Sequence, residues 1–157
     1  MERVWITNGS TSIAPIVNSL TAACEDGFLP TDIYMLSNPQ IDEVTEQATT
    51  LMKTIVTAKD GVEPSVTVTE IEDETDFDEI SMYLQSAIEA GQEAGAEIAV
   101  DITPGRRFWS VISFRAGLKY DVKHLVYTHV TSERYFGECY PEIPRTAIEL
   151  IDFTEVL

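Results

Sequence analysis

Short apolar runs alternate along the chain with longer segments whose apolar residues recur at helical spacing. The short runs are rich in β-branched residues and predict strands at 4–7, 32–36, 65–71, 97–103, 124–130 and 148–153. Residues three and four apart in the longer segments predict helices at 13–20, 41–58, 80–88 and 108–120. In the second of these helices the expected apolar stripe consists of Val44, Ala48, Leu51, Met52 and Ile55.

This alternation of strand and helix predicts an α/β fold. Parallel strands need a crossover helix between them, so the expected architecture is a Rossmann-like three-layer sandwich with helices on both faces of a mostly parallel sheet. The run 97–103 is almost continuously apolar, as expected for a central strand. No helix is expected before 148–153, so this last strand is predicted to pair antiparallel at an edge. The whole chain, 1–157, is expected to form one domain.

The chain is strongly acidic, with 27 Asp and Glu residues against 10 Lys and Arg and a net charge of −17. Repulsion by phosphate backbones and anionic lipids argues against duplex DNA and membrane partners. The N-terminal segment has no signal-peptide pattern and passes directly into a strand, so a cytoplasmic location is expected. Seven of the ten bases nevertheless follow residue 100, where a local anion site becomes plausible.

Two polar loops follow expected strands and have the chemistry of an anion site. The first, Asn8-Gly9-Ser10-Thr11, offers a glycine for close backbone approach, two hydroxyl groups and the start of a helix. The second, 101–107, reads Asp-Ile-Thr-Pro-Gly-Arg-Arg and adds two guanidinium groups, which match phosphate oxygens bidentately. Each loop alone is also consistent with an ordinary turn or helix cap, but together at equivalent strand ends they favour an anionic, nucleotide-like ligand.

Other chemistry is disfavoured. Neither GxxxxGK[ST] nor GxGxxG is present, so neither a Walker loop nor a dinucleotide cofactor is expected, and no metal or other cofactor is predicted. Cys24 and Cys139 match no zinc spacing and are expected to be buried or half-buried free thiols. His124 and His129 should lie on opposite faces of one strand. The acidic stretch 72–79 is expected to be a solvated helix start.

The second loop resembles the Asp/Asn-x-Thr-Gly-Gly-Thr-Lys/Arg signature of the CARF domain, the CRISPR-associated Rossmann fold. The first loop lies where that family has its other ligand motif, and the order of strands and helices also fits. The resemblance implies a homodimer that binds a cyclic oligoadenylate, such as cyclic tetra- or hexa-adenylate, across its twofold axis. Small standalone members can be ring nucleases, which cleave this second messenger without metal through attack of a ribose 2′-hydroxyl and leave a 2′,3′-cyclic phosphate.

The resemblance also implies roles for individual residues. Ser10 or Thr11 would orient the attacking ribose, and Arg106 or Arg107 would stabilise the phosphorane charge. The ligand would further contact residues of both loops and of the turn after the second strand, where an adenine edge could be read: Asn8, Gly9, Thr103, Pro104, Gly105, Ser37 and Asn38.

Two departures from the signature stand in the second loop. Pro104 replaces the first glycine and removes a backbone N–H, and Arg106 replaces the threonine, which leaves open which arginine enters the site. No Arg-x4–6-His ribonuclease signature or winged helix is found, so an effector or DNA-binding regulator is not expected. Two alternatives remain open at this point: a non-catalytic sensor or sink for the same ligand, and an unrelated Rossmann-like protein for another phosphorylated nucleotide.

Overall fold

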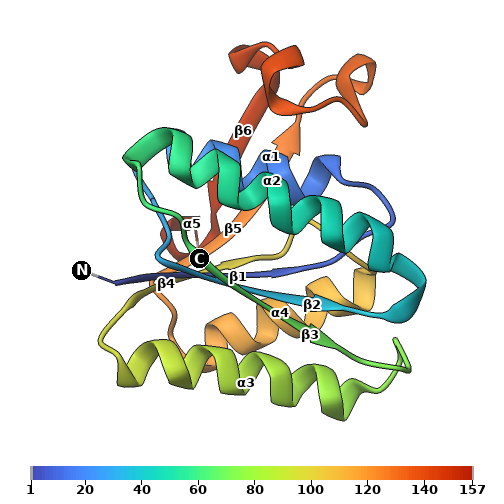
Figure 1. The fold of residues 1–157 in the computed structure, drawn as a ribbon, viewed down its shortest axis with the longest axis vertical. Helices are drawn as coiled ribbons and strands as arrows, with labels where there is room; N and C mark the ends of the chain where they lie inside the picture. The colour runs from blue at the N-terminus through green and yellow to red at the C-terminus, as the bar shows by residue number, and fades with distance from the viewer. Residues whose placement is uncertain (1, 157) are drawn as a thin grey trace.

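The protein forms a six-stranded sheet in the order β3-β2-β1-β4-β5-β6, described here from a computed structural model for residues 2–156 (Figure 1). The first five strands are parallel, and β6 pairs antiparallel with β5 at the edge. The predicted fold class, including the antiparallel edge, is therefore confirmed. The strands are β1 (Arg3–Asn8), β2 (Asp32–Ser37), β3 (Ser65–Glu70), β4 (Glu97–Asp101), β5 (His124–Val130) and β6 (Ile148–Asp152).

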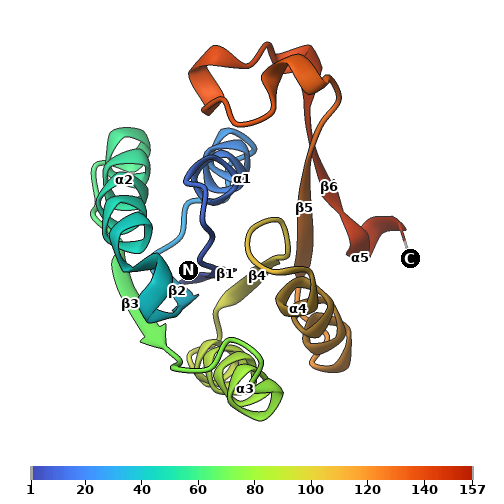
Figure 2. The same cartoon turned by 90° about the vertical axis from the view of Figure 1, so that its right-hand side faces the viewer.

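Helices cover both faces of this sheet, as Figure 2 shows. The helices α1 (Ala14–Glu25) and α2 (Asp42–Asp60) pack together on one face, and α3 (Phe77–Glu93) and α4 (Arg107–Lys119) pack together on the other. A short helix, α5 (Phe153–Val156), follows β6. Among residues 2–156 no helix is long and apolar enough to cross a membrane.

Each layer of helices encloses its own apolar core. The alternation of strand side chains divides β1 between them: Trp5 belongs to the core under α1 and α2, and Ile6 to the core under α3 and α4. Two details differ from the sequence prediction. Leu51 is 41% exposed because α2 turns Ala48, Met52 and Val56 towards the sheet instead. Residue 153, expected to end the last strand, begins α5.

Between β5 and β6 the chain makes an excursion, residues 131–147, which lies beside α1 (Figures 1 and 2). It contains three 3-10 turns and is closed at its base by a hydrogen bond of 2.8 Å from Thr131 N to Ala147 O. The side chain of Asn18 on α1 donates to Glu138 O at 2.8 Å, which ties the excursion to the body of the fold. The sequence predicted this segment only as a loop.

Candidate functional site

The two polar loops meet at the centre of the sheet. β1 and β4 are adjacent and parallel, so the loops that follow them leave the same edge. The chain then turns to opposite faces, into α1 after β1 and into α4 after β4. Such a point, where crossover direction reverses, opens a crevice beyond the carboxyl ends of the strands, and α/β proteins place ligands there.

A cavity of about 660 Å³ occupies this position. Of the eleven residues predicted to bind the ligand, seven line it: Gly9, Ser10, Thr11, Asn38, Gly105, Arg106 and Arg107. The remaining wall is formed by Gln40, Ile41, Glu74, Phe108 and Trp109. The structure therefore brings both loops and the turn after β2 to one cavity, while their roles in binding stay a prediction.

The two loops touch each other through glycines. Gly9 N donates to Leu36 O at 2.6 Å, and a Cβ at Gly9 would lie only 2.9 Å from that oxygen. Gly105 has φ +96°, in the region that favours glycine, and a Cβ there would lie 3.0 Å from Gly9 O and 3.1 Å from Trp109 Cε3. The sequence signal for close backbone approach thus has a packing cause: the second loop rests directly on the first.

The four other predicted residues do not line this cavity. Asn8 is buried and donates from Nδ2 to Ser113 Oγ at 3.2 Å. Thr103 Oγ1 accepts from Thr128 N at 2.9 Å. Pro104 is buried as well. The two hydrogen bonds hold the loops to α4 and β5, so Asn8 and Thr103 position the site.

Ser37 is fully buried and lies 2.6 Å from Thr45 Oγ1, oxygen to oxygen. It does not line the cavity, unlike its neighbour Asn38. Asn38 itself accepts from Gln40 N at 2.9 Å and caps the 3-10 turn Pro39–Ile41. The structure therefore separates two residues that the sequence prediction grouped as readers of an adenine edge.

The two arginines differ in their partners. Arg106 Nε and Nη2 donate to the two carboxylate oxygens of Glu74 at 3.0 and 3.1 Å. Arg107 is exposed, and in the described part of the chain it forms no ion pair. Of the two guanidinium groups at the cavity, Arg107 thus has all its donors available to an anion and Arg106 only some of them.

Asp101 ends β4 beneath the second loop and is fully buried. Burial raises the pKa of its carboxyl group to about 7, although hydrogen bonds from Thr103 and Thr7 act in the opposite direction. Thr103 N donates to Oδ1 and Thr7 Oγ1 to Oδ2, each at 3.0 Å. The carboxyl group therefore ties the ends of β1 and β4 together at the base of both loops.

Sequence reasoning missed Glu74. It lies in the acidic stretch that was interpreted as a solvated helix start, and the neighbouring Asp76 does cap α3 by accepting from Glu79 N at 3.1 Å. Glu74 instead faces the cavity, and its backbone oxygen accepts from Trp109 Nε1 at 2.9 Å. Nothing in the sequence distinguishes it from the other acids of the stretch, because the contact joins segments 32 residues apart.

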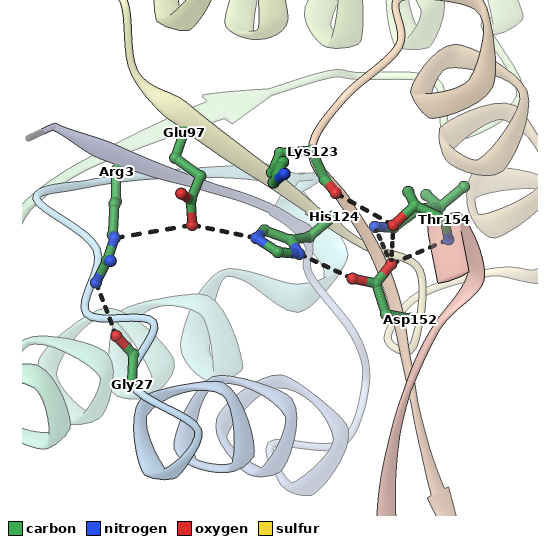
Figure 3. Close-up of polar contacts among 8 residues, drawn as sticks. Arg3, Gly27, Glu97, Lys123, His124, Asp152 and Thr154 are labelled. Atoms are coloured by element: carbon green, nitrogen blue, oxygen red, sulfur yellow. Dashed lines mark hydrogen bonds and ion pairs between the residues drawn. The ribbon is translucent and has the colours of Figure 1, made fainter. Parts of the chain in front are cut away.

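A second polar cluster lies at the opposite, amino-terminal edge of the sheet (Figure 3). His124 on β5 bridges two carboxylates: Nε2 lies 3.1 Å from Glu97 Oε1, and Nδ1 lies 2.8 Å from Asp152 Oδ2. Arg3 continues the row across β1, and its Nη1 donates to Gly27 O at 2.7 Å. The row thus cross-links four strands, which the sequence prediction of an ordinary strand histidine did not include.

A cavity of about 340 Å³ adjoins this cluster. Four carboxylates line it, those of Asp26, Glu97, Asp152 and Glu155, against two basic side chains. This balance disfavours an anionic ligand, so the cavity beside the two arginines is the better candidate for a phosphate-bearing molecule.

The cysteines take no part in either site. Cys24 is buried, and burial raises the pKa of its thiol to about 12, while Cys139 is half-buried, as predicted.

No family model matches the chain, and no curated protein matches it in sequence. Solved structures match in fold. Can2 from Sulfobacillus thermosulfidooxidans, in complex with cyclic tetra-adenylate, is 11% identical, with a TM-score of 0.58 over 80% of this chain and 32% of that one. Csm6 from Enterococcus italicus, bound to cyclic hexa-2′-fluoro-hexa-dAMP, is 17% identical, with a TM-score of 0.62 over 85% of this chain and 34% of that one.

The protein VC1899 from Vibrio cholerae is 11% identical to this chain, with a TM-score of 0.65 over 83% of it and 32% of that chain. The chain thus spans about a third of the length of each of these three structures. The Rossmann-like fold implied by the resemblance of the two loops is therefore confirmed.

Proposed function

We propose that the chain binds a cyclic oligoadenylate across a homodimer and cleaves it as a metal-independent ring nuclease. The observation that carries the proposal is the convergence of two glycine-bearing loops and two arginines on one cavity at the switch point of the sheet. Structures of the same fold hold cyclic tetra-adenylate in Can2 and a cyclic hexanucleotide in Csm6, which supports this class of ligand.

Binding would rest on backbone donors and on the guanidinium groups. Arg106 is the N-cap residue of α4, so free N–H groups of the first helical turn and a partial positive charge lie beside it. Arg107 supplies a bidentate fork for a phosphate. A cyclic ligand made of identical nucleotides is symmetric, so two copies of the cavity related by a twofold axis would hold it best.

Cleavage would follow from holding one ribose in line with the neighbouring phosphorus. The 2′-oxygen forms a bond to phosphorus, the bond from phosphorus to the 5′-oxygen breaks, the 2′-proton passes to solvent, and the leaving oxygen takes a proton from solvent. The products are a 2′,3′-cyclic phosphate and a 5′-hydroxyl. Ser10 and Thr11, at the cavity wall, would orient the ribose, and Arg107 would stabilise the charge on the phosphorane.

The test is incubation of the purified protein with cyclic tetra- and hexa-adenylate in EDTA, followed by chromatography of the products. Linear fragments ending in cyclic phosphate are expected, and Ser10→Ala should retain binding while cleavage slows at least tenfold. Ser81→Ala removes an exposed hydroxyl group on α3, away from the cavity, and is the matched control. It should behave as the unmodified protein does.

Two outcomes would overturn parts of the proposal. An intact ring that raises the melting temperature would leave a sensor or sink, since a ligand at 100 times its dissociation constant adds roughly 2.7 kcal/mol of stability. If neither ring is cleaved and neither raises the melting temperature, the proposal as a whole is overturned. A shift with mononucleotides alone would then favour a protein for another phosphorylated nucleotide.

A further inference from the structure

A carboxylate stands in the wall of the cavity proposed to hold phosphates. Glu74 engages Arg106 through both oxygens, and it lines the same cavity as Arg107 and the first loop. An acid at this position repels the proposed ligand, so its presence calls for a reason. The side chain is about two-thirds buried, with 30% of it exposed, so its charge is only partly screened by solvent.

The structure fixes Glu74 in place through contacts on both sides. Its backbone oxygen accepts from the indole of Trp109, which is itself buried at the start of α4. The next turn is held by Asp73, whose Oδ1 accepts from Thr75 N at 2.9 Å and from Thr75 Oγ1 at 2.7 Å. The carboxylate is therefore a built part of the wall, presented by an ordered loop.

The pairing with Arg106 leaves useful donors behind. A guanidinium group carries five N–H donors, and the fork to Glu74 uses one on Nε and one on Nη2. About three remain for a ligand. Glu74 thus lowers the charge of the wall while holding Arg106 in one orientation, which reduces the entropy that binding would otherwise cost.

The charges at the wall match one type of phosphate better than another. Arg106 and Arg107 contribute two positive charges and Glu74 one negative charge, which leaves one positive charge. A phosphodiester carries a single negative charge, whereas terminal phosphates and polyphosphates carry more. Specificity commonly comes from an element that disfavours the wrong ligand.

We infer that Glu74 is a specificity-determining residue that admits phosphodiesters to this cavity and disfavours phosphomonoesters and nucleoside polyphosphates. The inference rests on the proposed function for the identity of the favoured ligand. Discrimination of this kind would keep the site free of ATP, which has the same base and sugar as a cyclic oligoadenylate but a concentrated charge.

The experiment compares dissociation constants for ATP and for cyclic tetra-adenylate in EDTA. The unmodified protein is measured beside Glu74→Gln, which keeps an acceptor for Arg106 and removes the charge. Glu72→Gln removes a charge from the same loop at an exposed position that does not line the cavity, and it is the control. Glu74→Gln should tighten ATP binding about tenfold and ring binding at most threefold, because ATP concentrates its charges in one chain of phosphates beside Glu74, whereas the ring spreads single charges around its circumference. Glu72→Gln should change neither by more than about twofold.

Equal changes for both ligands, or no gain for ATP, would overturn the inference. Should Glu74→Gln fail to fold, Arg106→Gln gives the reciprocal test: it leaves the acid without its partner and should weaken ATP binding more than ring binding. An equal loss for both ligands in that variant would also overturn the inference. Absence of ring binding by the unmodified protein, with a gain for ATP in Glu74→Gln, would refute the proposed function and leave the charge discrimination standing.

Discussion

The close approach of the two loops predicts a large and specific cost for adding one methyl group at Gly105. This residue has φ +96°, and Gly27 has nearly the same value, +93°. A Cβ at Gly27 would meet nothing within 4 Å, whereas at Gly105 it would lie 3.0 Å from a backbone oxygen of the first loop. The pair therefore separates the strain of a positive φ from the cost of crowding.

Gly27→Ala should lower the free energy of unfolding by about 1 kcal/mol, which is the scale of the cost of placing an L-residue in left-handed backbone. Gly105→Ala should lower it by this amount and by a further ~2 kcal/mol, because the added Cβ would crowd Gly9 O and Trp109. The first is a backbone atom and the second a buried core side chain, so neither can move freely. For a chain of 157 residues, each kcal/mol corresponds to roughly 3 °C in melting temperature.

The assay is urea unfolding of the two variants and the unmodified protein at neutral pH, with thermal melts as a second measurement. The free energy of unfolding should fall about three times as much for Gly105→Ala as for Gly27→Ala. Equal losses for the two variants would refute the claim that the second loop rests on the first. The same crowding should displace the site, so ligand binding should weaken for Gly105→Ala and stay unchanged for Gly27→Ala.

Three further predictions concern charge. The raised pKa of Asp101 means that the folded state keeps a proton that the unfolded chain releases near pH 3.8, so stability falls as pH rises from about 4 to 7. Asp101→Asn removes this dependence. Between pH 4 and 8 the free energy of unfolding of the unmodified protein should therefore fall by up to about 4 kcal/mol relative to that of the variant. Parallel curves of unfolding free energy against pH for the two proteins would contradict this. The pKa of Asp152 is lowered, since hydrogen bonds from His124, Leu125 N and Thr154 outweigh the opposing effect of partial burial. Stability from this group is present above pH 3.8 and is lost as pH falls below it, so acid titration of Asp152→Asn should show a shallower decline than that of the unmodified protein. Arg107→Ala should weaken binding of cyclic tetra-adenylate about tenfold or more and reduce its salt dependence, because one charge-assisted phosphate contact is lost, whereas an unchanged dissociation constant would remove Arg107 from the site.

Much of the fold could be predicted from the sequence because local patterns and tertiary packing agree. The buried strand β4 has an apolar centre, Ile98–Val100, and the helix that begins near residue 42 ends at Gly61 with φ +77°. The sequence prediction extended β4 by two residues and β6 by one. Ile102, Thr103 and Phe153 continue the strand-like pattern of their runs, while the backbone already turns at these residues.

The candidate site could be predicted only in part, for a physical reason. Gly9 and Ser10 lie in the loop that follows β1, and Arg107 begins the helix after the loop that follows β4; parallel topology then places these segments together. Ser37 has the same local signal, but Thr45 on α2 takes its hydroxyl group inward. Contacts such as that between Glu74 and Arg106 depend on how separate loops pack, and no spacing in the sequence encodes them.

The most direct test of the central claim is the stoichiometry of binding, measured by calorimetry with cyclic tetra-adenylate and cyclic hexa-adenylate, together with the mass of the complex by light scattering. The proposed function predicts one ring per two chains and the mass of a dimer for at least one ring size. One ring per chain, or no binding heat with either ring, would contradict it.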